Sequence, residues 1–221
     1  GVSVQNKITI PEGLSTISVI HRINNDIRIR GDLISFSEEG VLAPNTYSFD
    51  ITTNKKDLFI KMKNNQERIL EAAWDNRDPD LPLKNALELL ILASIVEKEA
   101  GNKEDKKKVA SVFLNRLKKK MRLQSDPTVV YSLTKGREPL NRELNRSDLK
   151  TKSPFNTYKI DGLPPSPICN PSKSSIHAVA NPLKTDFLFF VANGEGGHNF
   201  SKNLKQHNRF VKEYRRLKIE N

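Results

Sequence analysis

The chain has 221 residues, 36% of them hydrophobic, which is enough for one large domain or a small domain attached to a medium one, and excludes long low-complexity disorder. Lysine and arginine outnumber the acidic residues by 37 to 26, a formal charge of +11, and a positive surface attracts polyanions of several kinds. The basic residues form no stripe with interleaved aromatic side chains, so we expect no nucleic-acid partner.

Residues 1–38 are predicted to form a small α/β module, and residues 39–221 a larger second domain. Residues 7–10 alternate between apolar and polar like a strand, and Ser15 can cap a helix. The apolar residues of that helix lie at helical spacing: Ile17, Val19, Ile20 and Ile23.

The second domain is predicted to begin with a short unit over residues 40–49 and an amphipathic helix near residues 55–64. From residue 83 the pattern changes. Residues 87–96 are apolar on nearly every side of a helix, which indicates burial at the centre of the domain. Another helix opens at Asp105, with its apolar residues on one face.

Residues 122–171 are rich in turn-forming residues, and a loop-rich stretch of this length is typical of a binding surface. After it we predict a short helix over 174–180, a buried strand over 187–191, a tight turn over 194–197, a return strand over 198–200 and a final amphipathic helix capped by Ser201. The fold class predicted is α+β: a small α/β module, then a mixed helical domain with a short β-hairpin.

The sequence offers little for metal or cofactor chemistry. Cys169 is the single cysteine, which excludes an internal disulfide and a cysteine-based zinc site. The four histidines form no pair at the helical spacing of metal ligands, and no phosphate-binding loop, dinucleotide fingerprint or serine nucleophile elbow occurs. We therefore expect neither a metal nor a cofactor. The longest apolar stretch, 89–96, is far below the ~18 residues of a membrane span.

Glu97 and Glu99 stand at the end of the apolar helix and are the first candidates for catalysis. Glu99 follows Leu92, Ile95 and Val96 at helical spacing, so it continues an apolar face. A carboxyl group held against apolar side chains loses hydration, which raises its pKa toward the range of a general acid. From the spacing alone, a helix whose last turn is simply solvated is the better interpretation.

Other polar residues are informative only as a set. Amide, hydroxyl and tyrosine groups suit a sugar, whose hydroxyls take hydrogen bonds and whose faces stack on rings. For any one of them taken alone, a turn or capping role is the better interpretation. The candidates are Asn115 and Arg116 in the second helix, Gln124, Ser125 and Asp126 in a polar turn, Tyr158 in a polar loop, and His198 after two glycines.

Several motifs, in the same order and at similar spacing, closely resemble the YceG-like family of endolytic murein transglycosylases. They occupy residues 92–99, 109–117, 121–129, 156–158, 162–165, 181–182 and 196–200. Residues 7–24 resemble, more weakly, a remnant of the LysM-like module that precedes the catalytic part in this family. The sequence departs from the family at Ala43, where an aromatic residue is usual, and at Asn45, where an aspartate is usual.

The resemblance implies an enzyme that cuts nascent peptidoglycan glycan strands internally, between N-acetylmuramic acid and N-acetylglucosamine, and leaves a 1,6-anhydromuramyl end. It implies Glu99 as the single catalytic acid and base, with Glu97 as the second choice. The polar residues named above, with Glu97, would bind the sugars. It also implies a single-pass protein of the bacterial inner membrane, with its catalytic part in the periplasm or outside the cytoplasmic membrane. Its N-terminal span would be absent from this chain, and cell-wall synthases are possible partners.

Two other functions fit the sequence. A glycoside hydrolase that uses water would leave reducing ends in place of anhydro ends. A non-catalytic wall-binding or scaffold module would need only the LysM-like start and the basic surface, and would bind glycan without either glutamate.

Overall fold

An apolar cluster at the N-terminal end is built on a two-stranded antiparallel sheet, β1 (Asn6–Ile10) and β2 (Asn45–Phe49). Alternate residues of both strands are buried, as expected for a sheet with one covered face. Helix α1 (Thr16–Asn24) covers that face and begins at Ser15, whose hydroxyl accepts a hydrogen bond from the amide of Ser18. The predicted strand and helix cap are therefore present. The structure is a computed structural model that describes residues 5–35 and 38–220.

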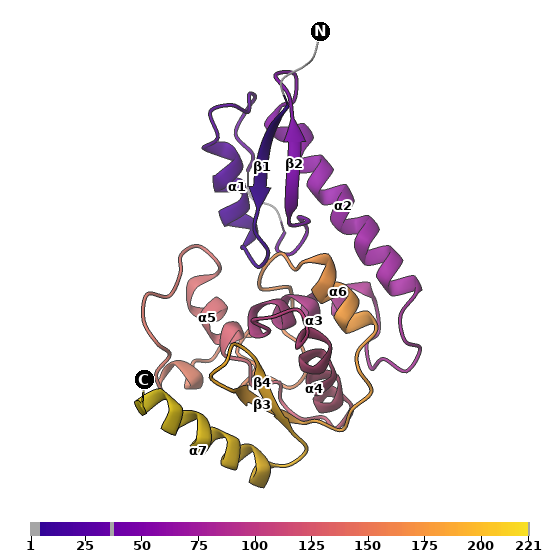
Figure 1. Cartoon of the computed structure of the whole chain (residues 1–221). Helices are drawn as coiled ribbons and strands as arrows, with labels where there is room; N and C mark the ends of the chain where they lie inside the picture. Colours follow the sequence, from indigo (N-terminus) through magenta and orange to yellow (C-terminus); the bar gives the residue numbers. More distant parts are fainter. Residues whose placement is uncertain (1–4, 36–37, 221) are drawn as a thin grey trace.

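Helix α2 (Lys55–Asp75) connects the two parts of the molecule (Figure 1). Asn54 and Asp57 form a capping box at its start, which satisfies amide groups that a helix end leaves free. Its first turns bury Leu58 and Met62 in the N-terminal cluster, and Ala73 near its end belongs to the larger cluster. The helix runs on to Asp75, well past the predicted end near residue 64, because its second half packs on the helical part.

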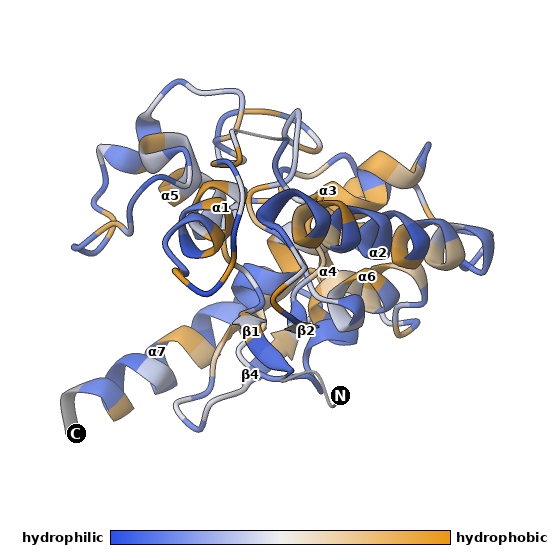
Figure 2. Ribbon diagram, turned by 90° about the horizontal axis from the view of Figure 1, so that it is seen from above, coloured by the Kyte–Doolittle hydropathy of each residue, from blue (hydrophilic) through white to orange (hydrophobic). Residues whose placement is uncertain are grey.

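The helical part is organised around α3 (Ala86–Glu99), against which α4 (Lys106–Lys118) and α6 (Lys173–Ala180) pack. Every residue from Leu89 to Val96 is buried, as the all-round apolar pattern predicts. Figure 2 colours α3 as hydrophobic along much of its length, whereas α7 (Leu204–Glu220) is largely hydrophilic. The larger apolar cluster therefore lies at the centre of this part.

The C-terminal hairpin consists of β3 (Phe189–Ala192) and β4 (His198–Ser201), and α7 packs on it. Two expectations are corrected here. The strand is half-buried, not fully buried, because both strands of a two-stranded sheet are edge strands. Ser201 is the last residue of β4, opposite Phe189, and Asn203 instead accepts the amide of Gln206 at the start of α7.

The stretch 122–171, predicted as loop-rich, contains one regular helix, α5 (Asp126–Thr134), and one short 3-10 turn, η1 (Asp148–Lys150). Asp126 is a helix residue and not only a turn former. Pro127 lies in the first turn of α5, where its fixed φ and missing N–H cost nothing. Turn chemistry and helix starts use the same residues, so composition alone did not separate them.

The predicted division between residues 38 and 39 stays a prediction; residues 1–4 and 36–37 of that module lie outside the described residues. Side chains from both sides of it, such as Ile8 and Tyr47, share one apolar cluster. Within the described parts of the chain, no helix is long and apolar enough to cross a membrane.

Candidate active site

Glu99 is the last residue of α3, and its side chain reaches a cavity of about 320 Å³. The helix stops there because Ala100 adopts an extended conformation. Glu99 Oε1 accepts a hydrogen bond of 2.7 Å from the Ser125 hydroxyl. The cavity walls come from α3, α4, the turn before α5, the loop at Tyr158, β3 and α7; they consist of Glu99, Arg116, Leu123, Gln124, Asp126, Tyr158, Phe189, Phe190, Leu204 and His207.

The carboxyl group of Glu99 has the electrostatics of a general acid. Burial raises its pKa to about 7; the Ser125 hydrogen bond and the charge of Arg116 lower it, and the charge of Asp126 raises it. Burial is the largest of these effects. A carboxyl group with this pKa is substantially protonated at neutral pH and can also act as the conjugate base.

The loop at residues 156–158 fixes the Ser125 turn through hydrogen bonds. Thr157, which is fully buried, accepts the Ser125 amide through its hydroxyl at 2.9 Å, and its carbonyl accepts the Gln124 amide at 3.2 Å. Gln124 itself has a φ of 51°, an uncommon conformation for a residue other than glycine. These contacts fix the hydroxyl that faces Glu99.

Asp126 and Tyr158 form a second polar pair in the cavity wall. The Tyr158 hydroxyl donates to Asp126 Oδ1 at 2.6 Å. Burial and the neighbouring Asp126 and Glu99 carboxylates raise the pKa of Tyr158 above its usual value, so the phenol stays neutral and a donor. The pair places one hydroxyl and one carboxylate beside the Glu99 carboxyl group.

Arg116 lies under the cavity on α4 and is buried. Its guanidinium donates from Nε to the Leu188 carbonyl at 2.7 Å and from Nη1 to the Leu123 carbonyl at 2.8 Å. Burial lowers its pKa, while the nearby Tyr158 and Glu99 side chains raise it. An arginine stays charged in proteins, so Arg116 joins two walls of the cavity and supplies a cation there.

Glu97, two residues before Glu99, does not line the cavity. Its carboxylate faces the start of α6, where Oε2 accepts the Ser172 amide at 2.8 Å and the Ser175 hydroxyl at 2.7 Å. Oε1 pairs with Lys106 at 3.0 Å, and both side chains are less than a tenth exposed. Burial raises the pKa of Glu97, but these hydrogen bonds together lower it below its ordinary value.

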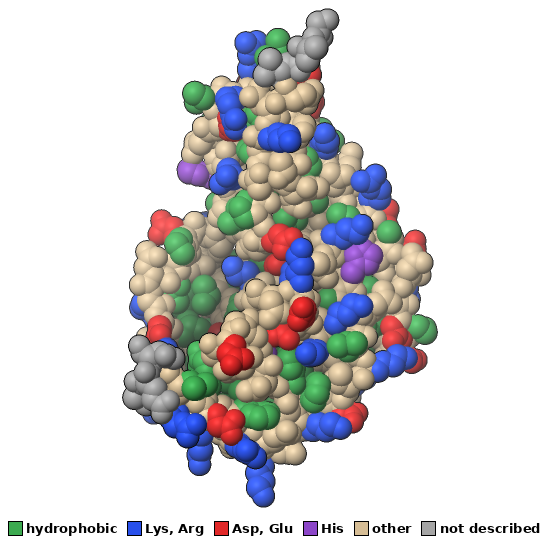
Figure 3. Space-filling model, viewed as in Figure 1, with side chains coloured by type: hydrophobic (Ala, Val, Ile, Leu, Met, Phe, Trp, Pro, Cys, Tyr) green, Lys and Arg blue, Asp and Glu red, His purple; other side chains and the backbone are tan. Residues whose placement is uncertain are grey.

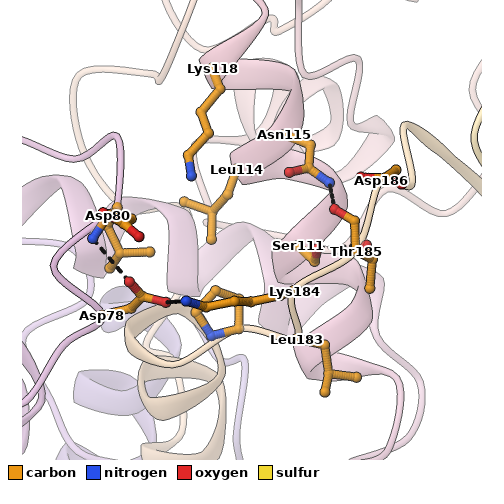
Figure 4. A pocket seen from close by; sticks show the side chains of 12 residues that line it. Asp78, Asp80, Ser111, Leu114, Asn115, Lys118, Leu183, Lys184, Thr185 and Asp186 are labelled. Atoms are coloured by element: carbon orange, nitrogen blue, oxygen red, sulfur yellow. Dashed lines mark hydrogen bonds and ion pairs between the residues drawn. The ribbon is translucent and has the colours of Figure 1, made fainter.

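Asn115 also lies outside the cavity, although it directly precedes Arg116 on α4. Its amide nitrogen donates to the carbonyls of Thr185 and Phe187, at 2.7 and 3.0 Å. It faces a separate pocket of about 290 Å³ (Figure 4), where Asp78 pairs with Lys184 and the Asp80 amide donates to Asp78. The hydrogen bond from the Asp80 amide lowers the pKa of Asp78 in that pocket, whereas burial raises the pKa of Glu99.

His198, predicted to line a cleft, is bound to Asp105 instead. Both its backbone amide and its ring Nδ1 contact Asp105 Oδ2, at 2.9 and 3.0 Å. The ring packs edge-on against Phe190, so it contacts the cavity only through that phenylalanine. Of the predicted site residues, the structure thus gathers Glu99, Arg116, Gln124, Ser125, Asp126 and Tyr158 around one cavity.

Besides Leu123, which lies within the 121–129 motif, four cavity residues were not predicted as site residues: Phe189 and Phe190 on β3, and Leu204 and His207 on α7. Local patterns place them only on a strand and on a helix face. Their arrival beside Glu99 depends on how α7 folds back over the hairpin, which no motif encodes. Among the residues that the structure describes, no group of three or more histidine, cysteine, aspartate or glutamate side chains could hold a metal ion.

Residues 1–213 match the YceG-like family, so the chain belongs to that family. Over 180 residues it is 42% identical to the endolytic murein transglycosylase of Bacillus subtilis (strain 168), covering 80% of this chain and 48% of that protein. Over 184 residues it is 36% identical to the protein of the same name from Streptococcus pneumoniae (strain D39), covering 82% of this chain and 33% of that protein.

A solved structure gives the same result for the fold. The crystal structure of a YceG-like protein from Listeria monocytogenes matches with a TM-score of 0.75 at 32% identity, over 94% of this chain and 76% of that one. The predicted α+β class is confirmed. The chain spans about half and about a third of the length of the two curated relatives.

Proposed function

We propose that the chain is the catalytic part of an endolytic murein transglycosylase, with Glu99 as its single acid and base. The observation that carries the proposal is the Glu99 carboxyl group, whose pKa burial raises to about 7, in a cavity walled by hydroxyl, carboxylate and aromatic groups. The relatives named endolytic murein transglycosylase support the same substrate, the glycan strands of peptidoglycan.

The reaction begins with protonated Glu99. It donates its proton to the glycosidic oxygen while the bond between that oxygen and the muramic anomeric carbon breaks. The resulting carboxylate then takes the proton of the C6 hydroxyl of the same muramic residue, whose oxygen bonds to the anomeric carbon. Glu99 ends protonated and no water is consumed.

One carboxyl group suffices because the nucleophile is part of the substrate. Effective molarities of intramolecular nucleophiles reach ~10⁵ M or more, so neither a positioned water nor a second carboxylate nucleophile is needed. The Asp126 carboxylate, already bonded to Tyr158, is placed to stabilise the positive charge that develops at the anomeric carbon. Gln124, which is exposed at the rim, and Tyr158 would bind sugar hydroxyls.

A location and a class of protein partner accompany this proposal. The catalytic part would work on the outer side of the bacterial cytoplasmic membrane, tethered by a membrane span outside this chain. Cell-wall synthases, which make the nascent strands, would act beside it. The basic side chains scattered over the surface (Figure 3) suit a carboxylate-bearing polymer.

The test is the chemistry of the products. Uncross-linked glycan strands are digested with the purified chain, and the fragments are analysed by mass spectrometry. We expect internal fragments ending in 1,6-anhydromuramic acid. Fragments with reducing muramic ends, each heavier by one water, would show a hydrolase instead. Glycan binding without any fragments would show a wall-binding module.

A further inference from the structure

His207 reaches the Glu99 cavity from α7, an element that none of the sequence motifs connects with catalysis. Its ring stacks on Phe189, with centroids 5.2 Å apart and planes at 27°. Leu204, one turn earlier on the same helix face, lines the same cavity. Figure 1 shows α7 lying along the β3–β4 hairpin, which brings this face toward the site.

The two ring nitrogens of His207 differ in their surroundings. Nδ1 is buried and has no hydrogen-bond partner within the described residues. Nε2 also makes no hydrogen bond to any described residue, but unlike Nδ1 it is not buried. It is therefore accessible to a ligand. A buried N–H without an acceptor is rarer in proteins than a buried acceptor without a donor, so we assign the proton to Nε2.

The ring is neutral at neutral pH. Burial lowers the pKa of His207, and the positive charge of Arg116 lowers it further. With the proton on Nε2, the neutral imidazole offers a single accessible N–H donor at the cavity that His207 lines. Beside it, Leu204 is 56% exposed, so its side chain offers apolar surface to a ligand.

We propose that His207 and Leu204 form a subsite for the acetamido group of a 2-acetamido sugar, an inference that rests on the proposed function. Nε2–H donates to the acetamido carbonyl oxygen, and the methyl group packs on Leu204. An acetamido group presents an acceptor and a methyl group side by side, which is the complement of a donor and an apolar side chain on adjacent turns of one helix. The subsite holds the sugar against the cavity that contains Glu99.

The experiment compares N-acetylated oligosaccharides with the same oligosaccharides after N-deacetylation. Binding is measured in a Glu99→Gln background, so that turnover does not consume the ligand, and cleavage is measured with Glu99 present. His207→Phe keeps an aromatic ring on Phe189 but removes the donor. His207→Gln places an amide N–H near the position of Nε2. His177→Gln, on α6 and outside the cavity, is the matched control.

We expect His207→Phe to lower the preference for the acetylated ligand about tenfold, the effect of one lost hydrogen bond in a half-buried site. His207→Gln should recover part of it, and His177→Gln should leave it unchanged. An unchanged preference in His207→Phe would overturn the inference. So would an equal loss of affinity for both ligands, because that indicates a packing role.

Leu204→Ser keeps the experiment decisive if His207→Phe does not fold, since Leu204 is largely exposed. It should also lower the acetyl preference, and an unchanged preference would overturn the subsite. The proposed function has a separate test. If the protein prefers the acetylated ligand through His207 but cleaves no glycan, the subsite is supported and the transglycosylase function is contradicted.

Discussion

Glu97 and Glu99 are two residues apart on one helix but have opposite environments. Two helical residues at this spacing point about 200° apart, so one faces α6 and the other the cavity. Glu97 accepts hydrogen bonds from Ser172, Ser175 and Lys106, which lower its pKa in spite of burial. Glu99 has one such bond, from Ser125, and burial dominates. Glu97 therefore has an anchoring role, since it holds α3 against the start of α6, whereas Glu99 is available for proton transfer.

Glu99→Gln is expected to stabilise the protein at high pH. The folded pKa of about 7 exceeds the ordinary 4.5, so the native state binds more protons than the unfolded state between these values. Wild-type stability therefore falls as pH rises from about 4.5 to 7, and a glutamine escapes this loss. We expect an advantage for Glu99→Gln on the order of 2 kcal/mol at pH 8, absent at pH 4, in urea unfolding. An advantage that is equal at both pH values would contradict the raised pKa.

Glu97→Gln should behave in the opposite way. The substitution leaves Lys106 buried without its counter-charge, which costs about 3 kcal/mol or more. Because the folded pKa of Glu97 lies below its ordinary value, the stabilisation is present at neutral pH and is lost as pH falls through the folded pKa. The measurement is the same urea series. Greater stability than wild type at pH 8 would refute the anchor role.

At the scale of elements, the start of α5 influences the pKa of the proposed acid, Glu99. Ser125 precedes the first residue of α5, and its hydroxyl stabilises the ionised Glu99 carboxylate. Ser125→Ala removes that bond, so the Glu99 pKa rises further and the alkaline limb of the kcat/KM profile moves to higher pH. Ser132→Ala, on the same helix but bonded only to the Val129 carbonyl, is the control. If the alkaline limb does not move, the Ser125 hydroxyl does not influence the pKa of Glu99.

Sequence patterns predicted elements best where burial alone determines the local pattern of apolar residues. The all-round apolar helix at 87–96 and the strand at 7–10 are present because burial dictates their pattern. The helix α5 was missed because its first residues, Ser125, Asp126 and Pro127, are also the residues of turns. The length of α2 depends on contacts with both clusters, which a local pattern does not contain.

The same limit applies to the candidate site. The polar residues near Glu99 in sequence, from Arg116 to Asp126, belong to motifs and could be selected. Asn115 and His198 belong to the same motifs, yet they hold backbone segments and Asp105 in place. Motif membership therefore did not separate residues that face the cavity from residues that support it. His207 could be found only from the fold.

At the scale of the whole molecule, buried polar contacts join the N-terminal module to the helical part. Asn170 donates to the Leu14 carbonyl from both its backbone and its side-chain amide, and its carbonyl accepts the Gly13 amide. Its side-chain oxygen accepts the Leu42 amide at 2.8 Å. The Ser15 hydroxyl donates to the Gly136 carbonyl at 2.6 Å, just beyond α5. The module is thereby fixed to the helix whose first residues face Glu99.

Gly136→Ala tests this junction. Gly136 has a φ of +69°, and a Cβ there would lie 2.7 Å from the Cβ of Ser15. Gly162→Ala is the control, because its φ is +80° but a Cβ would meet nothing within 4 Å. Both share the strain of a positive φ, about 1 kcal/mol, and overpacking should cost Gly136→Ala about 1–3 kcal/mol more in thermal unfolding. An equal loss of stability in both variants would mean that Ser15 and its neighbours move aside without cost.

The central claim is that Glu99 alone carries the acid and base chemistry. The most direct test digests uncross-linked glycan strands with wild type, Glu99→Gln and Glu97→Gln, and measures the rate at which internal anhydromuramyl ends appear. We expect Glu99→Gln to lower the rate by at least ~10³-fold while remaining folded. Glu97→Gln should retain activity in proportion to the fraction that stays folded. Full cleavage by Glu99→Gln, with loss of cleavage by folded Glu97→Gln, would contradict the account.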